Sequence, residues 1–255
     1  VIRLRRNVGH QRAIAVGLGY VADRFPNARC VVMDSDGEDL PETIPALTAP
    51  LDAPDVYVVV AQRKKRVETF RFKLFYVFYK FLFGLLTGRA ISFGNFMALT
   101  PGAVRRLAAM PELGVHVAGA VILSKLRVRL CPLDRGPRYA GRSKMNFSGL
   151  LLHGFRALMI FAEDVQVRIG IGCFAIMAVS VFGIVLATVL KLLGFATPGW
   201  FSTVLGLLVL TLLQTGALTL MTLMMTGVMR SAIAPPDYRQ LVDEVIPAEG
   251  RAAAA

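Results

Sequence analysis

Cysteine, tryptophan and histidine are scarce in this sequence of 255 residues, which has three Cys, one Trp and three His. The cysteines and histidines are also dispersed, so no pair has the spacing of a disulfide framework or a zinc site. We interpret the histidines as local hydrogen-bonding residues. The sequence therefore excludes a disulfide-stapled secreted domain and a zinc-based centre. The residues concerned are Cys30, Cys131, Cys173, His10, His116 and His153.

Acidic residues are also in deficit, with 17 Asp and Glu against 29 Lys and Arg and a net charge of +12. The imbalance is local, because 23 of the basic and 11 of the acidic residues precede Phe147. A basic first part indicates an anionic partner, either substrate phosphates or the surface of an anionic membrane. No stacking-and-basic groove motif accompanies the charge, so nucleic acid is not predicted as a partner.

Charge is absent from two long stretches, residues 169–190 and 200–229. Each is long enough to cross a bilayer, and Lys191 and Pro198-Gly199 separate them. Hydrophobic content of 55% and a mean hydropathy of +0.57 also exceed those of ordinary soluble domains. We predict a transmembrane helical hairpin over residues 167–231. Arg168 precedes the first span and Arg230 follows the second, whereas only Lys191 lies at the far turn, so the positive-inside rule places the basic domain and both termini in the cytoplasm.

The most informative segment is residues 30–42, where an apolar run breaks into a cluster of carboxylates. The run predicts a buried strand that delivers acids to a cleft at the sheet edge. Strand alternation would point Asp34, Asp36 and Glu38 the same way, and oxygen ligands suit Mg²⁺ or Mn²⁺. The alternative is a solvated acidic turn before a helix N-terminus.

The pattern around this segment predicts an α/β domain. Helical spacing over residues 11–24 follows a turn at residues 7–10, which we expect to cap that helix; an ordinary helix cap by Asn7 is the alternative. Strands are predicted over residues 56–60, 91–99 and 127–132, and a helix after Pro41. This domain spans residues 1–145.

Two basic segments follow predicted strands, residues 63–66 and 135–144. Such runs are often solvated faces, but strand ends and glycines favour phosphate binding here. Two further segments, residues 70–86 and 146–161, are apolar but too short to span. The first is either a core helix or a helix lying in the membrane interface, and we favour the interface. The second predicts one or two interfacial helices within a juxtamembrane region of residues 146–166. The tail, residues 232–255, is expected to be poorly ordered.

Residues 34–42, Asp-Ser-Asp-Gly-Glu-Asp-Leu-Pro-Glu, resemble the acidic motif of family 2 glycosyltransferases of the dolichol-phosphate mannose synthase and polyprenyl-phosphate glycosyltransferase type. Four further segments stand in that family's order: residues 6–11, 63–66, 93–96 and 138–144. The resemblance covers most of residues 2–165. It implies a Rossmann-like fold of the GT-A type. The chain begins at Val1, and the family's opening strand-helix unit has no counterpart, so we expect the domain to be incomplete at its N-terminus.

The resemblance also implies an inverting, membrane-anchored enzyme that moves a sugar from a nucleotide-sugar to a polyprenyl-phosphate acceptor. Asp34, Asp36 and Glu38 would then hold Mg²⁺ or Mn²⁺ on the donor diphosphate. The implied substrate-binding residues are Asn7, Gly9, Asp39, Arg63, Arg138, Arg142 and Lys144.

Asn95 departs from the family pattern, which often has an Asp that activates the acceptor at this position. A phosphate monoester is already largely a dianion at neutral pH, so it needs positioning more than deprotonation. Asn95 is therefore kept as a catalytic-site candidate. A non-catalytic membrane-tethered scaffold and a polysaccharide-type glycosyltransferase are the alternatives, and self-association is left open.

Overall fold

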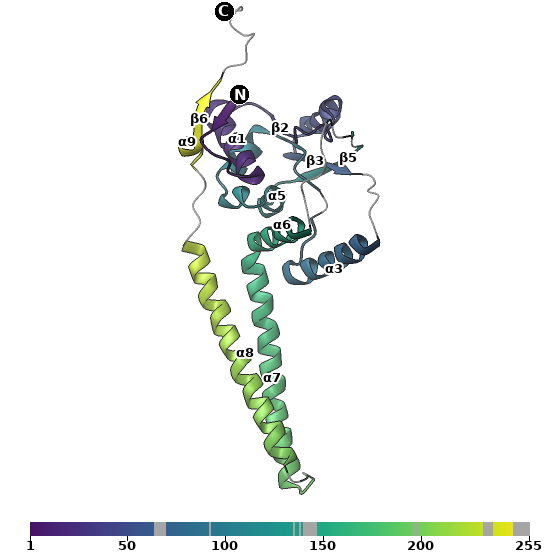
Figure 1. Ribbon diagram of the computed structural model, residues 1–255, viewed down its shortest axis with the longest axis vertical. Helices are drawn as coiled ribbons and strands as arrows, with labels where there is room; N and C mark the ends of the chain where they lie inside the picture. The colour runs from purple at the N-terminus through teal and green to yellow at the C-terminus, as the bar shows by residue number, and fades with distance from the viewer. Residues whose placement is uncertain are drawn as a thin grey trace, which may run out of the picture. The chain divides into compact units, whose positions relative to one another are not determined.

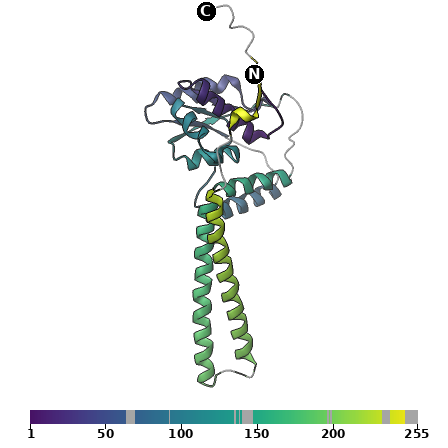
Figure 2. The ribbon, with the colours of Figure 1, turned by 90° about the vertical axis from the view of Figure 1, so that its left-hand side faces the viewer.

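The computed structural model describes residues 1–63, 70–91, 93–134, 136–137, 139, 147–195, 197, 199–231 and 237–246. It divides into two compact units (Figures 1 and 2). The first comprises Val1–Tyr76, Ala90–Ile160 and Ala234–Ala255, and the second comprises Val77–Arg89 and Phe161–Ile233. Most of the basic domain predicted from the sequence lies in the first unit, but its residues Val77–Arg89 belong to the second unit with the apolar hairpin.

The first unit is built on a four-stranded sheet in the order β2-β4-β3-β5. The strands are β2 (Cys30–Val32), β3 (Val58–Arg63), β4 (Met97–Leu99) and β5 (Val128–Leu133). β3 pairs parallel with β5, whereas β4 runs antiparallel to both β2 and β3. The sheet is therefore mixed, and β4 is much shorter than the strand predicted over residues 91–99.

The direction of β4 decides which loops meet. Because β2, β3 and β5 all run against β4, their carboxyl ends share one edge of the sheet with the amino end of β4. Met97 is paired with both Val32 and Val60, which fixes the register across the sheet at this edge. The loop after β2 and the residues before β4 are thereby brought together at one edge of the sheet.

Helices cover both faces of this sheet. On one face the core joins the sheet to α1 (His10–Arg24), α4 (Pro101–Ala108), η3 (Pro111–Gly114) and α5 (Val117–Leu123). On the other face, η1 (Pro41–Thr43), α2 (Ile44–Thr48) and η2 (Ala49–Asp52) follow β2, and Leu47 and Leu51 pack against Val59. Val58, Val59 and Val60 are fully buried, so β3 is the central strand that its unbroken apolar sequence predicted.

The helix predicted after the turn at residues 7–10 is present as α1. Gly9 is the N-cap residue, with a φ of 80°, and no side chain caps the helix. The Asn7 side chain instead accepts a hydrogen bond from the backbone N–H of Gly9 at 2.9 Å. The predicted turn therefore precedes the helix, whereas the alternative of a side-chain cap by Asn7 is wrong, because its amide oxygen closes a tight turn one step earlier in the chain.

The C-terminal tail is also more ordered than the sequence predicted. α9 (Tyr238–Leu241) and β6 (Val242–Val245) return to the first unit, where β6 pairs antiparallel with β1 (Ile2–Leu4). The Tyr238 hydroxyl donates a hydrogen bond to the Asp23 carboxylate on α1, and Arg239 forms an ion pair with the same carboxylate at 3.0 Å. The expectation of a poorly ordered tail is therefore wrong for residues 238–245, because specific polar contacts and strand pairing hold them.

The attachment of the tail should depend on pH. Hydrogen bonds from Tyr238 and then Arg239 lower the pKa of Asp23 below its ordinary value of 3.8. A carboxyl group with a lowered pKa stabilises the attached state above its ordinary pKa, and this contribution is lost as the pH falls through the lowered pKa. A spin label at Asp243→Cys should be immobilised at pH 7 and become more mobile as the pH falls below 3.8. Asp23→Asn should mobilise it at pH 7; equal immobilisation in this variant would contradict the contact.

The segment after β3 ends in the second unit. α3 runs from Phe70 to Thr87, and its described C-terminal part exposes Val77, Phe81 and Leu85 at four-residue spacing. Phe83 on the opposite side packs edge-on against Phe161, with 5.9 Å between ring centroids. This part of α3 is amphipathic in its packing and is not a core helix.

The end of α3 is tied to the start of α7 (Ala162–Leu192). Arg89 forms an ion pair with Asp164 at 3.2 Å, and an Arg168 guanidinium N–H donates to the Leu85 carbonyl at 3.0 Å. In the first unit, α6 (Phe147–Ile160) likewise exposes three large apolar side chains on one side, Leu152, Phe155 and Met159. The predicted juxtamembrane region of residues 146–166 therefore holds α6 and the first residues of α7.

The second unit consists largely of α7 and α8 (Trp200–Ser231), which lie side by side as an antiparallel hairpin (Figures 1 and 2). Both helices are long and apolar enough to cross a membrane by length and composition. Their apolar side chains are largely exposed, which distinguishes them from the buried core helices of a soluble protein.

Candidate functional site

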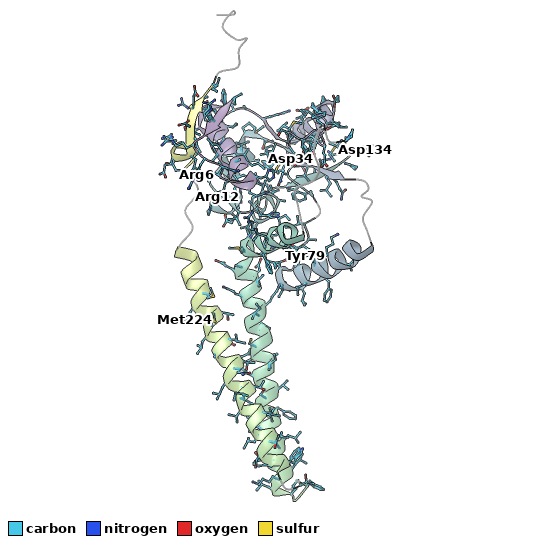
Figure 3. All side chains as sticks on the ribbon, viewed as in Figure 1. Arg6, Arg12, Asp34, Tyr79, Asp134 and Met224 are labelled. Carbon is cyan, nitrogen blue, oxygen red and sulfur yellow. The ribbon has the colours of Figure 1, made fainter. Side chains whose placement is uncertain are left out.

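The acidic loop, residues 34–39, follows β2 and is held by its own carboxylates (Figure 3, where Asp34 is labelled). The Asp39 side chain is 5% exposed and accepts a hydrogen bond from the Asp34 backbone N–H at 2.9 Å. The Asp36 side chain accepts from the Glu38 backbone N–H at 3.1 Å. Asp39 thus supports the loop through the backbone of Asp34, and its contact with a substrate stays a prediction.

Asn95 and His10 meet beside this loop. The Asn95 Nδ2 and His10 Nε2 atoms are 2.7 Å apart, and His10 Nε2 is 3.9 Å from Asp34 Oδ1. Asn95 comes from the amino end of β4, His10 from the start of α1 and Asp34 from the end of β2. The antiparallel placement of β4 is therefore what joins two predicted catalytic-site residues, with His10 between them.

A second segment, residues 136–139, docks on the acidic loop. The Gly136 backbone N–H donates to the Glu38 carbonyl, and the Tyr139 N–H donates to the Asp36 carbonyl, each at 3.0 Å. The Tyr139 ring lies over Gly37, whose φ is 88° and whose missing Cβ would come within 2.5 Å of the ring. Glycine is thus required at residue 37 both for its backbone conformation and for this close approach.

Gly37→Ala should uncouple the two segments. Adding a methyl group at a positive φ costs about 1–2 kcal/mol, and here it also collides with the Tyr139 ring. We expect a drop of about tenfold or more in the sugar-transfer activity that the sequence resemblance implies. Gly194→Ala is the control, because Gly194 has a φ of 79° with nothing near its missing Cβ. Tyr139→Ala should partly rescue Gly37→Ala in a double-mutant cycle; strictly additive losses would count against the contact.

The acids do not form a metal cage by themselves. Among the residues that the structure describes, no group of three or more His, Cys, Asp or Glu side chains is arranged to hold a metal ion. Asp34, Asp36 and Glu38 therefore do not fit a closed three-carboxylate site. A looser mode, in which Mg²⁺ uses one or two carboxylates and completes its shell with water and substrate phosphates, stays a prediction for these acids.

The remaining predicted residues are placed in part. Asn7 and Gly9 form the turn that precedes His10, next to the pair that His10 makes with Asn95. The Arg63 backbone ends β3 and is paired with Leu133 at the end of β5, so it lies at the same sheet edge. The Arg63 side chain and all of Arg138, Arg142 and Lys144 lie outside the described residues.

Sequence reasoning missed His10 and Tyr139 as parts of this site. His10 was interpreted as a local hydrogen-bonding residue, although its position beside the Asn7-Gly9 turn was a signal. Tyr139 stands among basic residues and is 76% exposed, so nothing in its pattern indicated a docking role. Cys30 on β2 adds no reactive group, because burial raises the pKa of its thiol and keeps it protonated at neutral pH.

Comparison with known proteins agrees with this geometry. Residues 1–114 match the model of glycosyl transferase family 2. The chain is also 25% identical over 212 residues to an uncharacterized glycosyltransferase, YkoT, of Bacillus subtilis strain 168. That match covers 81% of this chain and 61% of the relative, so the chain spans less than two thirds of the relative's length.

Proposed function

We propose, from the premise that residues 1–114 carry a family 2 glycosyltransferase domain, that this protein transfers a sugar from a nucleotide-sugar to a polyprenyl phosphate at the cytoplasmic membrane surface. The observation that carries the proposal is the docking of residues 136–139, inside the basic segment, on the acidic loop. A site for a donor diphosphate and a segment suited to an acceptor phosphate are thereby joined by two backbone hydrogen bonds.

The donor would bind at the acidic loop. Asp36 and Asp34 are the residues that would share Mg²⁺ or Mn²⁺ with the diphosphate, and the ion would neutralise charge on the departing nucleotide. The Asp39 carboxylate would keep Asp34 in place by accepting the hydrogen bond from the Asp34 backbone N–H. The mixed α/β sheet, with helices on both faces, is the GT-A architecture that such a domain implies.

The acceptor would bind through the basic segment. The guanidinium groups of Arg138 and Arg142 and the ammonium group of Lys144 can each donate hydrogen bonds to a phosphate. A phosphate oxygen would attack the anomeric carbon in line while the bond to the donor diphosphate breaks, which inverts the anomeric centre. Asn95 and His10 would orient the acceptor beside Asp34. No strong base is needed, because the acceptor is largely a dianion at neutral pH.

The experiment that tests this function is transfer in reconstituted vesicles. A panel of labelled nucleotide-sugars is offered with Mn²⁺ and either a polyprenyl phosphate or a soluble sugar acceptor. We expect one donor to yield a lipid that carries a single sugar through one phosphate. A growing sugar chain would favour the polysaccharide-type alternative. No transfer from any donor, with donor binding intact, would favour the non-catalytic scaffold.

The hairpin predicts a topology that labelling can check. If α7 and α8 span the bilayer, Ser148 before α7 and Thr197 between the helices lie on opposite sides. Single cysteines at these positions, in a chain without Cys30, Cys131 and Cys173, should be labelled from opposite faces of sealed vesicles. Labelling of both positions from the same face would rule out the hairpin and the cytoplasmic placement of the domain.

A further inference from the structure

The two long helices contact each other through one side of α8. On α8, Thr215 is 8% exposed, and Leu208 lies against Gly183 of α7, whose missing Cβ would be 3.1 Å from it. On α7, Ser180 and Ala187 are similarly buried. Small residues therefore let the two backbones approach, as in other membrane helix pairs. The rest of the α8 surface is left uncovered by α7.

Gln214 lies on the uncovered side, near the midpoint of α8. It is the only Asn or Gln between residues 167 and 239, and its side chain is exposed. No hydrogen bond of its amide is formed within the described part of the chain. The hydroxyls of the same helix behave differently: Thr211, Thr215 and Thr219 each donate to the carbonyl four residues earlier, at 2.7–2.8 Å.

An amide that faces hydrocarbon is costly, because lipid offers it no hydrogen-bond partner. Polar side chains in membrane helices accordingly face other helices and hydrogen-bond across the interface. The Gln214 amide therefore indicates that another helix covers this side of α8. This step rests on the proposed membrane insertion of the hairpin.

The residues around Gln214 form a seam suited to helix packing. Exposed side chains follow alternating steps of four and three residues, which is the spacing of a left-handed coiled coil. Met224, labelled in Figure 3, is 74% exposed and lies on the side of α8 that faces away from α7. The seam comprises Thr203, Leu207, Leu210, Gln214, Ala217, Met221 and Met224, all exposed.

We propose that the α8 seam pairs with the same seam of a second copy of this chain. An amide is both donor and acceptor, so Gln214 can bond reciprocally with Gln214 of the partner subunit. Copies inserted in the same orientation present this residue at the same depth, and their α8 helices run parallel about a two-fold axis. A polar residue at one seam position also fixes the register of parallel helices. The amides of two copies can bond with each other, lie at the same depth and are carried by helices that run in the same direction. We therefore infer that a second copy covers the seam.

Disulfide cross-linking in native membranes tests this pairing in the full chain without its three cysteines. Leu210→Cys and Ala217→Cys on the seam should give cross-linked dimers on oxidation. Val209→Cys is the matched control, because Val209 is adjacent in sequence and 39% exposed but lies off the seam. Cross-linking of residue 209 equal to that of the seam positions, or of none of them, would overturn the proposal. Resistance to alkaline extraction checks membrane insertion separately, so failure of the pairing is distinguishable from failure of the hairpin.

The role of the amide is tested by moving it. Gln214→Leu should weaken dimerisation, measured by energy transfer between labelled copies in bilayers, by about three- to tenfold. Gln214→Asn should retain most of the association. Gln214→Leu combined with Val209→Gln has the same amide off the seam and should not recover it. Dimerisation that is unchanged in Gln214→Leu, or fully restored by the displaced amide, would contradict the proposed contact.

Discussion

Asp36→Ala is expected to abolish metal-dependent binding of a nucleoside diphosphate and to lower transfer by about a hundredfold or more. Asp36 belongs to the acidic loop, and its own backbone carbonyl accepts the hydrogen bond from the Tyr139 N–H. Its loss removes a negative oxygen ligand where a divalent cation would join the donor diphosphate. Calorimetry with Mn²⁺ and a nucleoside diphosphate measures the effect directly.

Asp52→Ala is the matched control for this change. Asp52 is also acidic, but its side chain is 71% exposed and pairs with Arg29 at 2.8 Å on the surface. Asp52→Ala should keep nearly all of its nucleotide and metal binding, because the exposed ion pair that it removes contributes less than about 1 kcal/mol to stability. If Asp36→Ala bound nucleotide and metal as tightly as Asp52→Ala, the acidic loop would not be the donor site.

Replacing Arg138, Arg142 and Lys144 together with Gln is expected to raise the KM for polyprenyl phosphate by about a thousandfold or more. Each charged hydrogen bond to a phosphate contributes about 1.5–3 kcal/mol, and three are removed. Donor and metal affinity should change little, because the acidic loop is untouched. Transfer at varied acceptor concentration separates the acceptor KM from kcat.

The control for the basic segment removes the same number of positive charges from another part of the surface. Arg106, Lys125 and Arg129 are exposed and lie outside the site, and replacing them with Gln removes the same three charges. A general loss of attraction to anionic lipid would weaken both variants alike. A specific phosphate site predicts a large effect for the first triple variant only. Equal KM values in the two would contradict it.

Much of the fold followed from local patterns. The unbroken apolar run at Val58–Val60 predicted a central strand, and the structure buries all three side chains. The acidic segment was correctly placed at a strand end, and charge-free length predicted both long helices. These features depend on hydrophobic burial and helix periodicity, which are visible in a short window of sequence.

The features that escaped prediction depend on contacts between distant residues. Residues 238–245 have no strong pattern of their own, and their order comes from pairing with β1 and from Asp23 on α1. The pairing of His10 with Asn95 needs β4 to run antiparallel, which no local signal specifies. The approach of Tyr139 to Gly37 likewise joins residues about a hundred positions apart. Chain topology, not propensity, decides such contacts.

Photochemical cross-linking tests most directly whether the acidic loop and the basic segment form one site for the donor and the lipid phosphate. A polyprenyl phosphate with a photoreactive group on the isoprene unit nearest the phosphate is irradiated with the protein in vesicles, and the modified peptides are identified by mass spectrometry. We predict cross-links within residues 136–144, suppressed by excess unlabelled polyprenyl phosphate and by the triple Gln substitution. Cross-links confined to α7 and α8, or insensitive to that competition, would contradict a lipid-phosphate site at the acidic loop.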